Sequence, residues 1–399
     1  MALRPLEKEI LNTLPFSKRG ESLIGQEMFK VLDKARILEE KGTYIYHLEL
    51  GNPRMPPSAE IVEATIMSVR DFNLGYASSA GIPELRRALA ERYTLLSGRQ
   101  IRDENIVISP ANLLISQFLD LTCDPGDRVV LFTPAFPTYL AATAHIGLDV
   151  VDMPLDPETG FDLTESDIKA AIEAHPKAIM VNSANNPTGK VYTQEALEFL
   201  ARCCSDEGIW LLSDETYAEL CFGRQFYSLS ALDYPQIVVI SSFSKSFSIP
   251  GYRTGYAIAH KTVSEKLALS SSTLISCLPI FTQRGCLAGL SAIDQYVAGV
   301  RKHFASVARK CSEIINQSGV LRCSTPQAGF YIFLDIGVTG LDDISFSNKL
   351  LEERNTAVTP GRSFGELYKS FIRIAICGKY GDVQQGINRV LSLTRELIG

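Results

Sequence analysis

The chain has 399 residues, of which 46% are hydrophobic and 21% are charged, as is typical of a globular protein with a large buried core. Its 39 basic and 45 acidic residues are mixed along the chain and give a net charge of −6, which argues against a nucleic acid partner because no basic stripe is present. The lack of a long apolar run, of a signal-type start in MALRPLEKEI and of C-x-x-C spacing among the nine cysteines predicts a cytoplasmic protein with no membrane partner.

The first part of the chain predicts a helix followed by an α/β region. A helical pattern covers residues 23–41, and the strand candidate YIYHLEL (44–50) ends before the proline-rich turn GNPRMPPS. From about residue 58 to 290, helical stretches alternate with short apolar strands, which is typical of a mostly parallel sheet with helices on both faces. The predicted strands cover residues 105–109, 128–132, 178–182, 209–213 and 237–240.

The last part of the chain predicts a smaller α+β unit. A long helical pattern at 294–317 precedes YIFLDI (331–336), and FIRIAI (371–376) precedes a final helix. Between them, a helix at 344–354 and a strand at 356–359 are predicted. We therefore expect three parts: an N-terminal segment (1–50) that packs with the small domain, a large domain (51–290) and a small C-terminal domain (291–399).

Groups with useful chemistry follow the five predicted strands of the large domain. Open α/β sheets bind ligands beyond the carboxyl ends of their strands, so these groups are expected to meet at one edge. The start of a helix there is also an anion site. In chain order the strands lead to SPAN (109–112) with a helical run from Asn112, to PAFPTY with Phe136, to NNPTG with Asn186, to SDETY with Asp214 and Tyr217, and to Lys245.

The stretch SSFSKSFSIPGYRTGYAI (241–258) presents Lys245 in a serine-rich turn. Lysine forms Schiff bases with carbonyl compounds, including pyridoxal phosphate. Ser242, Ser244 and Arg253 are donors suited to a phosphate, and arginine can bind one bidentately. A lone loop lysine is more commonly a solvated charge, so the interpretation depends on the other strand ends.

Each of those groups also has an ordinary structural interpretation: Asp214 as a helix cap, Asn186 as a turn former and Phe136 as a core aromatic. Together they match one cofactor. A carboxylate can keep a pyridine nitrogen protonated, an amide and a phenol can bind a ring hydroxyl, and an aromatic can cover the ring. The combination therefore favours a pyridoxal phosphate site over five unrelated structural roles.

With these residues in place, the chain resembles a fold-type-I pyridoxal-phosphate-dependent enzyme, specifically a class I/II aminotransferase, from LGNP near residue 50 to FIRIAI near residue 371. The resemblance implies a large domain with a mostly parallel sheet and a smaller α+β domain. The matching motifs are AGIPELRRALA (80–90), NNPTG (185–189), SDETYAEL (213–220), SFSKSFSIPGYRTGY (242–256), AGFYIFLDI (328–336) and VTPGRSFGE (358–366).

The resemblance implies a role for each matching residue around the cofactor ring. Lys245 corresponds to the lysine that binds the cofactor aldehyde and, once displaced by substrate, moves protons. Asp214 corresponds to the partner of the pyridine nitrogen, and Asn186 and Tyr217 to the donors to the ring hydroxyl. Phe136 corresponds to the stacking aromatic. Lys245, Asp214 and Tyr217 are thus the expected catalytic residues.

The resemblance also implies a phosphate site and a dimer. Ser242, Arg253 and the backbone at Ala111 and Asn112 correspond to the phosphate-binding groups. Tyr76 corresponds to a tyrosine that reaches the phosphate of the neighbouring subunit's cofactor, which implies a homodimer with shared active sites.

For the substrate, Arg373 corresponds to the arginine that binds the α-carboxylate, with Gly51 lying against the same carboxylate and Asn186 beside it. The expected reaction moves an amino group between an α-amino acid and a 2-oxo acid by a ping-pong mechanism. Pocket shape near Arg54, residues 16–23 and the Tyr76 loop is expected to set the substrate.

Departures from the family pattern leave the substrate and the reaction outcome open. Ala111 stands where the family commonly has glycine, and Pro110 before it removes one backbone donor to the phosphate. Arg54 replaces a usual acidic residue, Ala184 replaces a frequent proline, and CGKYGD (377–382) is unusual. One alternative is a β-lyase or decarboxylating deaminase on the same scaffold. A second is a non-enzymatic regulator, which would need an added DNA-binding domain for which we expect the residues before Ser22 to be too few.

Overall fold

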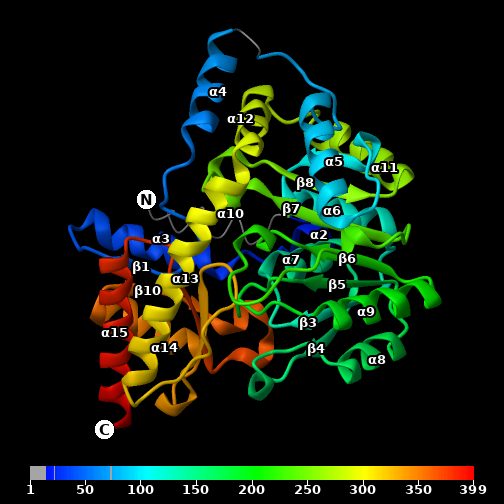
Figure 1. Cartoon of the computed structure of the whole chain (residues 1–399). Helices are drawn as coiled ribbons and strands as arrows, with labels where there is room; N and C mark the ends of the chain where they lie inside the picture. The colour runs from blue at the N-terminus through cyan, green and yellow to red at the C-terminus, as the bar shows by residue number, and fades with distance from the viewer. Residues whose placement is uncertain (1–14, 22, 72–73) are drawn as a thin grey trace.

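Seven strands form the central sheet, in the order β2-β8-β7-β6-β5-β3-β4 (Figure 1). The computed structural model describes residues 15–21, 23–71 and 74–399. Because β8 is antiparallel to both of its neighbours and the other pairs are parallel, β2 and the remaining five strands all end at the same edge. The strands are β2 (Ile106–Ser109), β3 (Arg128–Thr133), β4 (Asp149–Pro154), β5 (Ala178–Asn182), β6 (Trp210–Asp214), β7 (Ile237–Ser242) and β8 (Gly255–Ala259).

The expected mostly parallel sheet is confirmed, and the five predicted strands agree with the structure within one or two residues. The sequence pattern did not single out β4 or β8. The strand β4 lies at the sheet edge and none of its residues is fully buried, so it has no continuous apolar run. The strand β8, GYAIA, is too rich in glycine and alanine to be recognised by its side chains.

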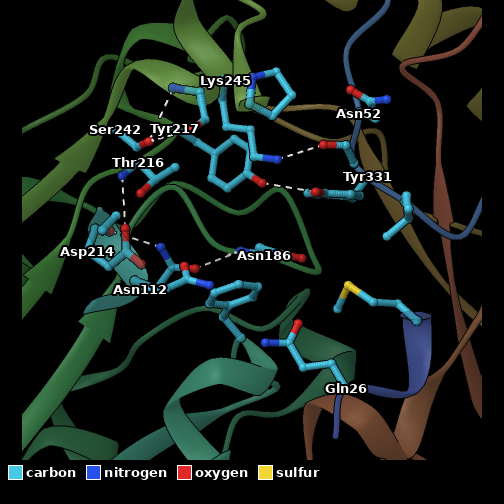
Figure 2. Close-up of a pocket in the computed structure, with 18 of the residues that line it drawn as sticks. Gln26, Asn52, Asn112, Asn186, Asp214, Thr216, Tyr217, Ser242, Lys245 and Tyr331 are labelled. Carbon is cyan, nitrogen blue, oxygen red and sulfur yellow. Dashed lines mark hydrogen bonds between the residues drawn. The ribbon is translucent and has the colours of Figure 1, made fainter. Parts of the chain in front are cut away.

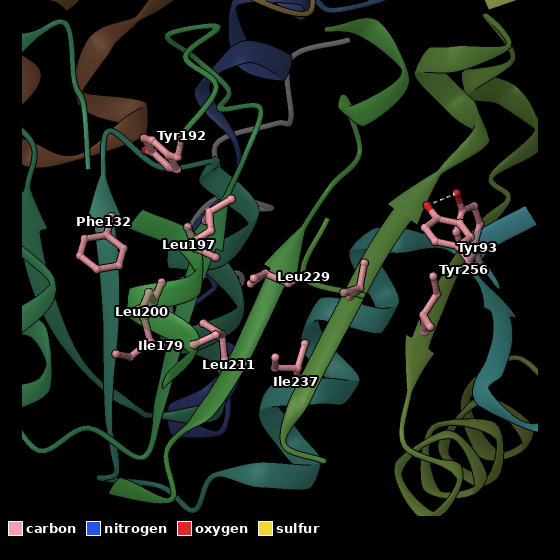
Figure 3. Packing of buried hydrophobic residues seen from close by; sticks show 14 of the residues in the cluster. Tyr93, Phe132, Ile179, Tyr192, Leu197, Leu200, Leu211, Leu229, Ile237 and Tyr256 are labelled. Carbon is pink, nitrogen blue, oxygen red and sulfur yellow. Dashed lines mark hydrogen bonds between the residues drawn. The ribbon is translucent and has the colours of Figure 1, made fainter. Parts of the chain in front are cut away.

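Helices cover both faces of this sheet, as expected (Figure 1). Along β3, Val130 and Phe132 face the side covered by α5, α8 and α9, whereas Val129 and Leu131 face the side covered by α6, α7 and α11. Figure 3 shows part of the first cluster, in which the hydroxyl groups of Tyr93 and Tyr256 hydrogen-bond at 2.9 Å. The helices are α4 (Ala59–Arg70), α5 (Pro83–Ser97), α6 (Ala111–Thr122), α7 (Pro137–Ile146), α8 (Glu165–Glu173), α9 (Gln194–Glu207), α10 (Phe243–Ser246), α11 (Lys261–Leu274) and α12 (Ile280–Ser291).

A second core forms around the three-stranded antiparallel sheet β11-β12-β9. A separate two-stranded sheet joins the early and late parts of the chain, since β1 pairs in parallel with β10 (Figure 1). The elements are α2 (Lys18–Glu21), α3 (Glu27–Glu40), β1 (Tyr46–His47), α13 (Ile293–Gln317), β9 (Tyr331–Asp335), α14 (Asp343–Arg354), β10 (Thr356–Ala357), β11 (Thr359–Pro360), β12 (Phe371–Ala375) and α15 (Tyr380–Ile398).

Two predicted strands of this region are wrong in extent. The expected strand 44–50 is only the two-residue β1, because the backbone of Leu48 turns to bond both Ala357 and Ala375. The expected strand 356–359 is split at Val358 into β10 and β11, which pair in different sheets. The domain boundaries at residues 50 and 290 stay a prediction. No helix among the described residues is long and apolar enough to cross a membrane.

Candidate active site

A cavity of about 510 Å³ lies at the edge where the parallel strands end. Of the twelve residues that the sequence predicts for the site, eleven line this cavity, and Tyr76 does not. Figure 2 shows several of them converging from separate strands and loops. The eleven are Gly51, Ala111, Asn112, Phe136, Asn186, Asp214, Tyr217, Ser242, Lys245, Arg253 and Arg373.

Lys245 enters the cavity from α10, the short helix that follows β7. Its Nζ donates a hydrogen bond of 2.6 Å to the carbonyl oxygen of Gly51. Burial is the main cause that lowers the pKa of Lys245 to about 8; Cys377 opposes this shift, and the positive charges of Arg373 and Arg253 add to it. A lysine with this pKa is partly neutral near pH 8, and the neutral amine is the form that attacks a carbonyl carbon.

Asp214 stands at the end of β6 and is buried. Its Oδ2 accepts a hydrogen bond of 2.6 Å from the hydroxyl of Tyr139, and its Oδ1 accepts one of 3.0 Å from the backbone N–H of Thr216. Burial raises the pKa of Asp214, whereas these two donors favour the ionised form. Tyr139 was not predicted for the site, although it lies three residues after Phe136, the N-cap of α7, and the centres of the two rings are 5.7 Å apart.

Arg373 lies in the middle of β12 and is only 1% exposed. Its Nη1 donates to Asn186 Oδ1 at 3.1 Å, and its Nη2 donates to the carbonyl oxygen of Glu49 at 2.6 Å and to Thr359 Oγ1 at 3.1 Å. The guanidinium also lies 4.3 Å from the centre of the Tyr331 ring. These contacts fix a planar cation in the cavity wall, which is the geometry that binds a carboxylate.

Asn186 is positioned by a neighbour that the sequence analysis did not name. Its backbone N–H donates to Asn182 Oδ1 at 2.8 Å, and Asn182 Nδ2 donates to the carbonyl oxygen of Asp214 at 2.9 Å. Asn182 is the last residue of β5, so it couples two neighbouring strand ends.

Tyr217 and Gly51 are organised by Tyr331 of β9, which was also missed. The two tyrosine hydroxyls hydrogen-bond at 3.0 Å. A Cβ placed on Gly51 would lie 1.7 Å from the Tyr331 hydroxyl oxygen, so glycine is required at position 51 for this close approach. Tyr331 lies within the quoted motif AGFYIFLDI, but its contact with Tyr217 spans 114 positions and cannot be read from the sequence.

The proposed phosphate end combines α6 with the turn around Ser242. The Ser242 side chain accepts from the backbone N–H of Ser244 at 3.2 Å and caps α10. Arg253 adopts a left-handed backbone conformation with φ of 56° and lines the cavity. Ala111 and Asn112 begin α6 after Pro110, whose lack of an N–H removes one backbone donor there.

Tyr76 lies outside this cavity and is 90% exposed. It occupies the connection between α4 and α5, next to Ala77, whose backbone N–H donates to Cys277 Sγ at 3.3 Å. Its predicted role in a neighbouring subunit's site stays a prediction.

The N-terminal side of the cavity is formed by the start of α3. Gln26, Met28 and Phe29 line the cavity, whereas Arg54 and the described residues 16–21 and 23 do not, so the expected role of these segments in substrate choice stays a prediction. Gln26 Nε2 donates to Thr138 Oγ1 at 3.0 Å, which connects this segment to α7. The apolar residues that begin α3, rather than the helix before it, therefore form the wall.

The family model described as aminotransferase class I and II matches residues 45–390. The chain is 32% identical to an aspartate aminotransferase of Sulfurisphaera tokodaii, over 94% of this chain and 96% of that protein. It is 31% identical to a probable aspartate/prephenate aminotransferase of Aquifex aeolicus, over 91% and 94%. The solved structure of Thermus thermophilus aspartate aminotransferase with maleate superposes with a TM-score of 0.90 at 27% identity, covering 96% of this chain and 100% of that one.

Proposed function

Because the protein belongs to the aminotransferase class I and II family and is therefore a transaminase, which moves an amino group between an amino acid and a 2-oxo acid, we propose that pyridoxal phosphate binds in the cavity at Lys245. The observation that carries this proposal is the presence of Lys245, with its lowered pKa, and the buried Asp214 in one cavity. Members of this family use that cofactor. No finding favours the β-lyase or decarboxylating deaminase that the sequence left open.

The residues of the cavity fit this cofactor. When bound, pyridoxal phosphate supplies an aldehyde for the amino group and a ring that accepts electron density. Asp214 would keep the ring nitrogen protonated, because its hydrogen bonds from Tyr139 and Thr216 favour the carboxylate. Asn186 and Tyr217 would donate to the ring hydroxyl. Asp214 ends β6 and Tyr217 follows it, and Asn186 follows β5.

The rest of the cofactor would be held at both ends of the cavity. Phe136 would cover the ring face, and Ser242, Arg253 and the start of α6 at Ala111 and Asn112 would hold the phosphate.

In the reaction, Arg373 binds the substrate α-carboxylate with Gly51 and Asn186 alongside, which aligns the Cα–H bond with Lys245. Once the substrate amino group has displaced it, the neutral amine of Lys245 would take the Cα proton and later give a proton back. A positioned acid–base group of this kind contributes roughly 10²- to 10⁴-fold. Because the amino group would stay at the site on the cofactor while the first 2-oxo acid leaves and the second enters, we expect ping-pong kinetics.

The assembly we propose is a homodimer with shared sites, located in the cytoplasm. The 90% exposure of Tyr76 supports the homodimer, since a large aromatic side chain is seldom left this open without a partner. The nine free cysteines support the cytoplasmic location, since thiols stay reduced in that compartment.

The test of the cofactor proposal is Lys245→Ala. We expect this variant to keep pyridoxal phosphate through the phosphate contacts, to lose the visible absorbance of the covalently bound cofactor, and to lose turnover by roughly 10²-fold or more. Lys302→Ala, at an exposed position of α13, is the matched control and should change neither the visible absorbance nor the turnover. Full turnover of Lys245→Ala with an unchanged spectrum would contradict the proposal.

A further inference from the structure

Tyr331, the first residue of β9, lines the cavity and is buried there. The turn before it is tied to the segment that carries Tyr217. Gly329 donates its backbone N–H to the carbonyl oxygen of Leu220 at 3.1 Å and has a φ of 68°, a conformation that favours glycine. A Cβ on Gly329 would lie 3.3 Å from Cδ1 of Tyr217, so this turn packs directly against that ring. The positions of the two tyrosines are therefore set together.

The hydroxyl of Tyr331 lies 3.0 Å from the hydroxyl of Tyr217 (Figure 2). Each phenol has one proton to donate. In the proposed function, Tyr217 gives its proton to the ring hydroxyl oxygen of the cofactor. The oxygen of Tyr217 is then left as the acceptor, so Tyr331 is the donor of the hydrogen bond between the two tyrosines.

The charge of Arg373 favours the same direction. Burial raises the pKa of Tyr331, and the positive charge of Arg373 is the main effect that opposes this increase. Burial raises the pKa of Tyr217 well above its ordinary value, and Tyr331 adds to that increase. Tyr331 is therefore the more acidic of the two phenols, and the more acidic hydroxyl is the better hydrogen-bond donor.

The ring of Tyr331 has a second contact, with the guanidinium of Arg373. The central guanidinium carbon lies 4.3 Å from the centre of this ring and 5.0 Å from the centre of the Phe364 ring. Both distances are within the range of cation–π attraction, which is strongest for a desolvated cation. Arg373 is only 1% exposed, so the aromatic contact helps to hold its charge in the cavity wall.

We propose that Tyr331 is a positioning residue for both halves of the site: its hydroxyl donates to Tyr217, and its ring holds the guanidinium of Arg373. This inference rests on the proposed function, in which Tyr217 donates to the ring hydroxyl of pyridoxal phosphate and Arg373 binds the substrate α-carboxylate. A hydroxyl that accepts one hydrogen bond is polarised and donates a stronger one, so Tyr331 strengthens the bond from Tyr217 to the cofactor.

The first test records the visible spectrum of the enzyme loaded with pyridoxal phosphate as a function of pH for Tyr331→Phe. A donor to the ring hydroxyl oxygen favours its ionised form, so weaker donation by Tyr217 should move the spectral midpoint to higher pH. We expect a shift of about 0.3 pH unit or more, because polarisation strengthens a hydrogen bond by roughly 10–30%.

Tyr93→Phe is the matched control for this test. It removes the same kind of buried hydroxyl pair, since the hydroxyl groups of Tyr93 and Tyr256 lie 2.9 Å apart in the core of the large sheet. Its spectral midpoint should equal that of the natural protein. An unchanged midpoint in Tyr331→Phe, or an equal shift in both variants, would overturn the proposed donation to Tyr217.

The second test separates the hydroxyl of Tyr331 from its ring. Tyr331→Phe keeps an aromatic ring against Arg373, whereas Tyr331→Leu removes it. A panel of the standard amino acids is added to each loaded enzyme without a 2-oxo acid, and the change in visible absorbance gives a maximal rate and a half-saturating concentration. We expect Tyr331→Phe to lower only the maximal rate, and Tyr331→Leu also to raise the half-saturating concentration by roughly fivefold or more.

The outcomes of the second test distinguish this inference from the proposed function. Equal half-saturating concentrations in Tyr331→Phe and Tyr331→Leu would overturn the role of the ring. If no amino acid changes the spectrum of the natural enzyme, the proposed function fails instead. Tyr331→Phe keeps the shape of the side chain and is expected to fold even if Tyr331→Leu is not tolerated, so the spectral midpoint still decides the role of the hydroxyl.

Discussion

At the scale of single residues, the hydrogen bond from Tyr139 helps to keep the Asp214 carboxylate ionised. Burial raises the pKa of Asp214, and the 2.6 Å hydrogen bond from the Tyr139 hydroxyl opposes this shift. A hydrogen bond to a charged group contributes about 1.5–3 kcal/mol. Its loss therefore moves the pKa of the carboxyl upward and weakens its hold on a protonated ring nitrogen.

We predict that Tyr139→Phe lowers kcat by roughly tenfold or more and shifts the acid limb of the pH profile of kcat/KM toward higher pH. The direction follows because a carboxylate with a raised pKa is protonated at a higher pH. The measurement is the pH profile together with the visible spectrum of the bound cofactor. Tyr234→Phe, whose hydroxyl bonds the carbonyl of Ile209 instead, is the control. An unshifted profile for Tyr139→Phe would show that the tyrosine does not tune Asp214.

The sequence predicted the site residues whose own functional group has a recognisable use, but not the residues that act by positioning another residue. Lys245, Asp214 and Arg373 were predicted because amine, carboxylate and guanidinium groups have distinct uses in that family pattern, and they line one cavity. Tyr139 and Tyr331 were missed although both stand in quoted stretches. Tyr139 matters through its contact with Asp214, which lies 75 positions away in the sequence, and Tyr331 through its contact with Tyr217, which lies 114 positions away. Only the folded chain reveals these contacts.

At the scale of elements, the short strand β1 carries a charge network that connects α3 to the wall of the site. His47 Nδ1 lies 2.8 Å from Glu49 Oε1, and His47 Nε2 lies 3.1 Å from Glu39 Oε1 of α3. The carbonyl oxygen of the buried Glu49 accepts from Arg373. The hydrogen bond to Glu49 raises the pKa of His47 to about 9, with Glu39 adding to the effect and burial opposing it.

This network predicts a specific dependence of stability on pH. The pKa of His47 is about 9 in the folded protein, above the value of about 6.5 in the unfolded chain. Its contribution is therefore fully present below about pH 6.5, at most about 3 kcal/mol, and is lost as the pH rises through about 9. We expect His47→Gln to lower the urea midpoint most near about pH 6 and least above about pH 9.

The matched control is His303→Gln, because His303 is an exposed residue of α13. Its urea midpoint should follow that of the natural protein across the pH range. Equal destabilisation by His47→Gln at every pH would show that the imidazole contributes through packing rather than through charge.

The sequence predicted elements best where a strand is covered on both faces. The strand β5 was predicted without error because all of its residues are buried and apolar up to Asn182, so it is a continuous run. The register and direction of β8 could not be predicted, because they depend on its pairing with β2 and β7 rather than on its own side chains. The split of β10 from β11 likewise depends on pairing with β1 and β12.

At the scale of the whole molecule, the site is assembled from parts that lie far apart along the chain. Asp214 comes from the central sheet, Lys245 from the short helix α10 that follows it, Arg373 from the three-stranded sheet, and Met28 from the N-terminal helix α3. In the homodimer that we propose, a second copy of the chain would complete this assembly. Apolar side chains are exposed on α4 beside the Tyr76 connection, among them Ile66 at 44% and Met67 at 61%. Such exposure is typical of an interface.

If Tyr76 serves the neighbouring subunit, the homodimer of Tyr76→Ala should bind pyridoxal phosphate roughly tenfold or more weakly, because a hydrogen bond to a charged phosphate is lost. Mixing refolded Tyr76→Ala and Lys245→Ala subunits should restore sites that pair an intact Lys245 with an intact Tyr76 of the other chain. At a cofactor concentration too low to saturate Tyr76→Ala alone, the mixture should therefore exceed the summed turnover of the separate variants. A mixture of Tyr76→Ala with a double variant, Tyr76→Ala and Lys245→Ala, is the control and should show no gain. If the first mixture also shows none, Tyr76 acts within its own chain or not at all.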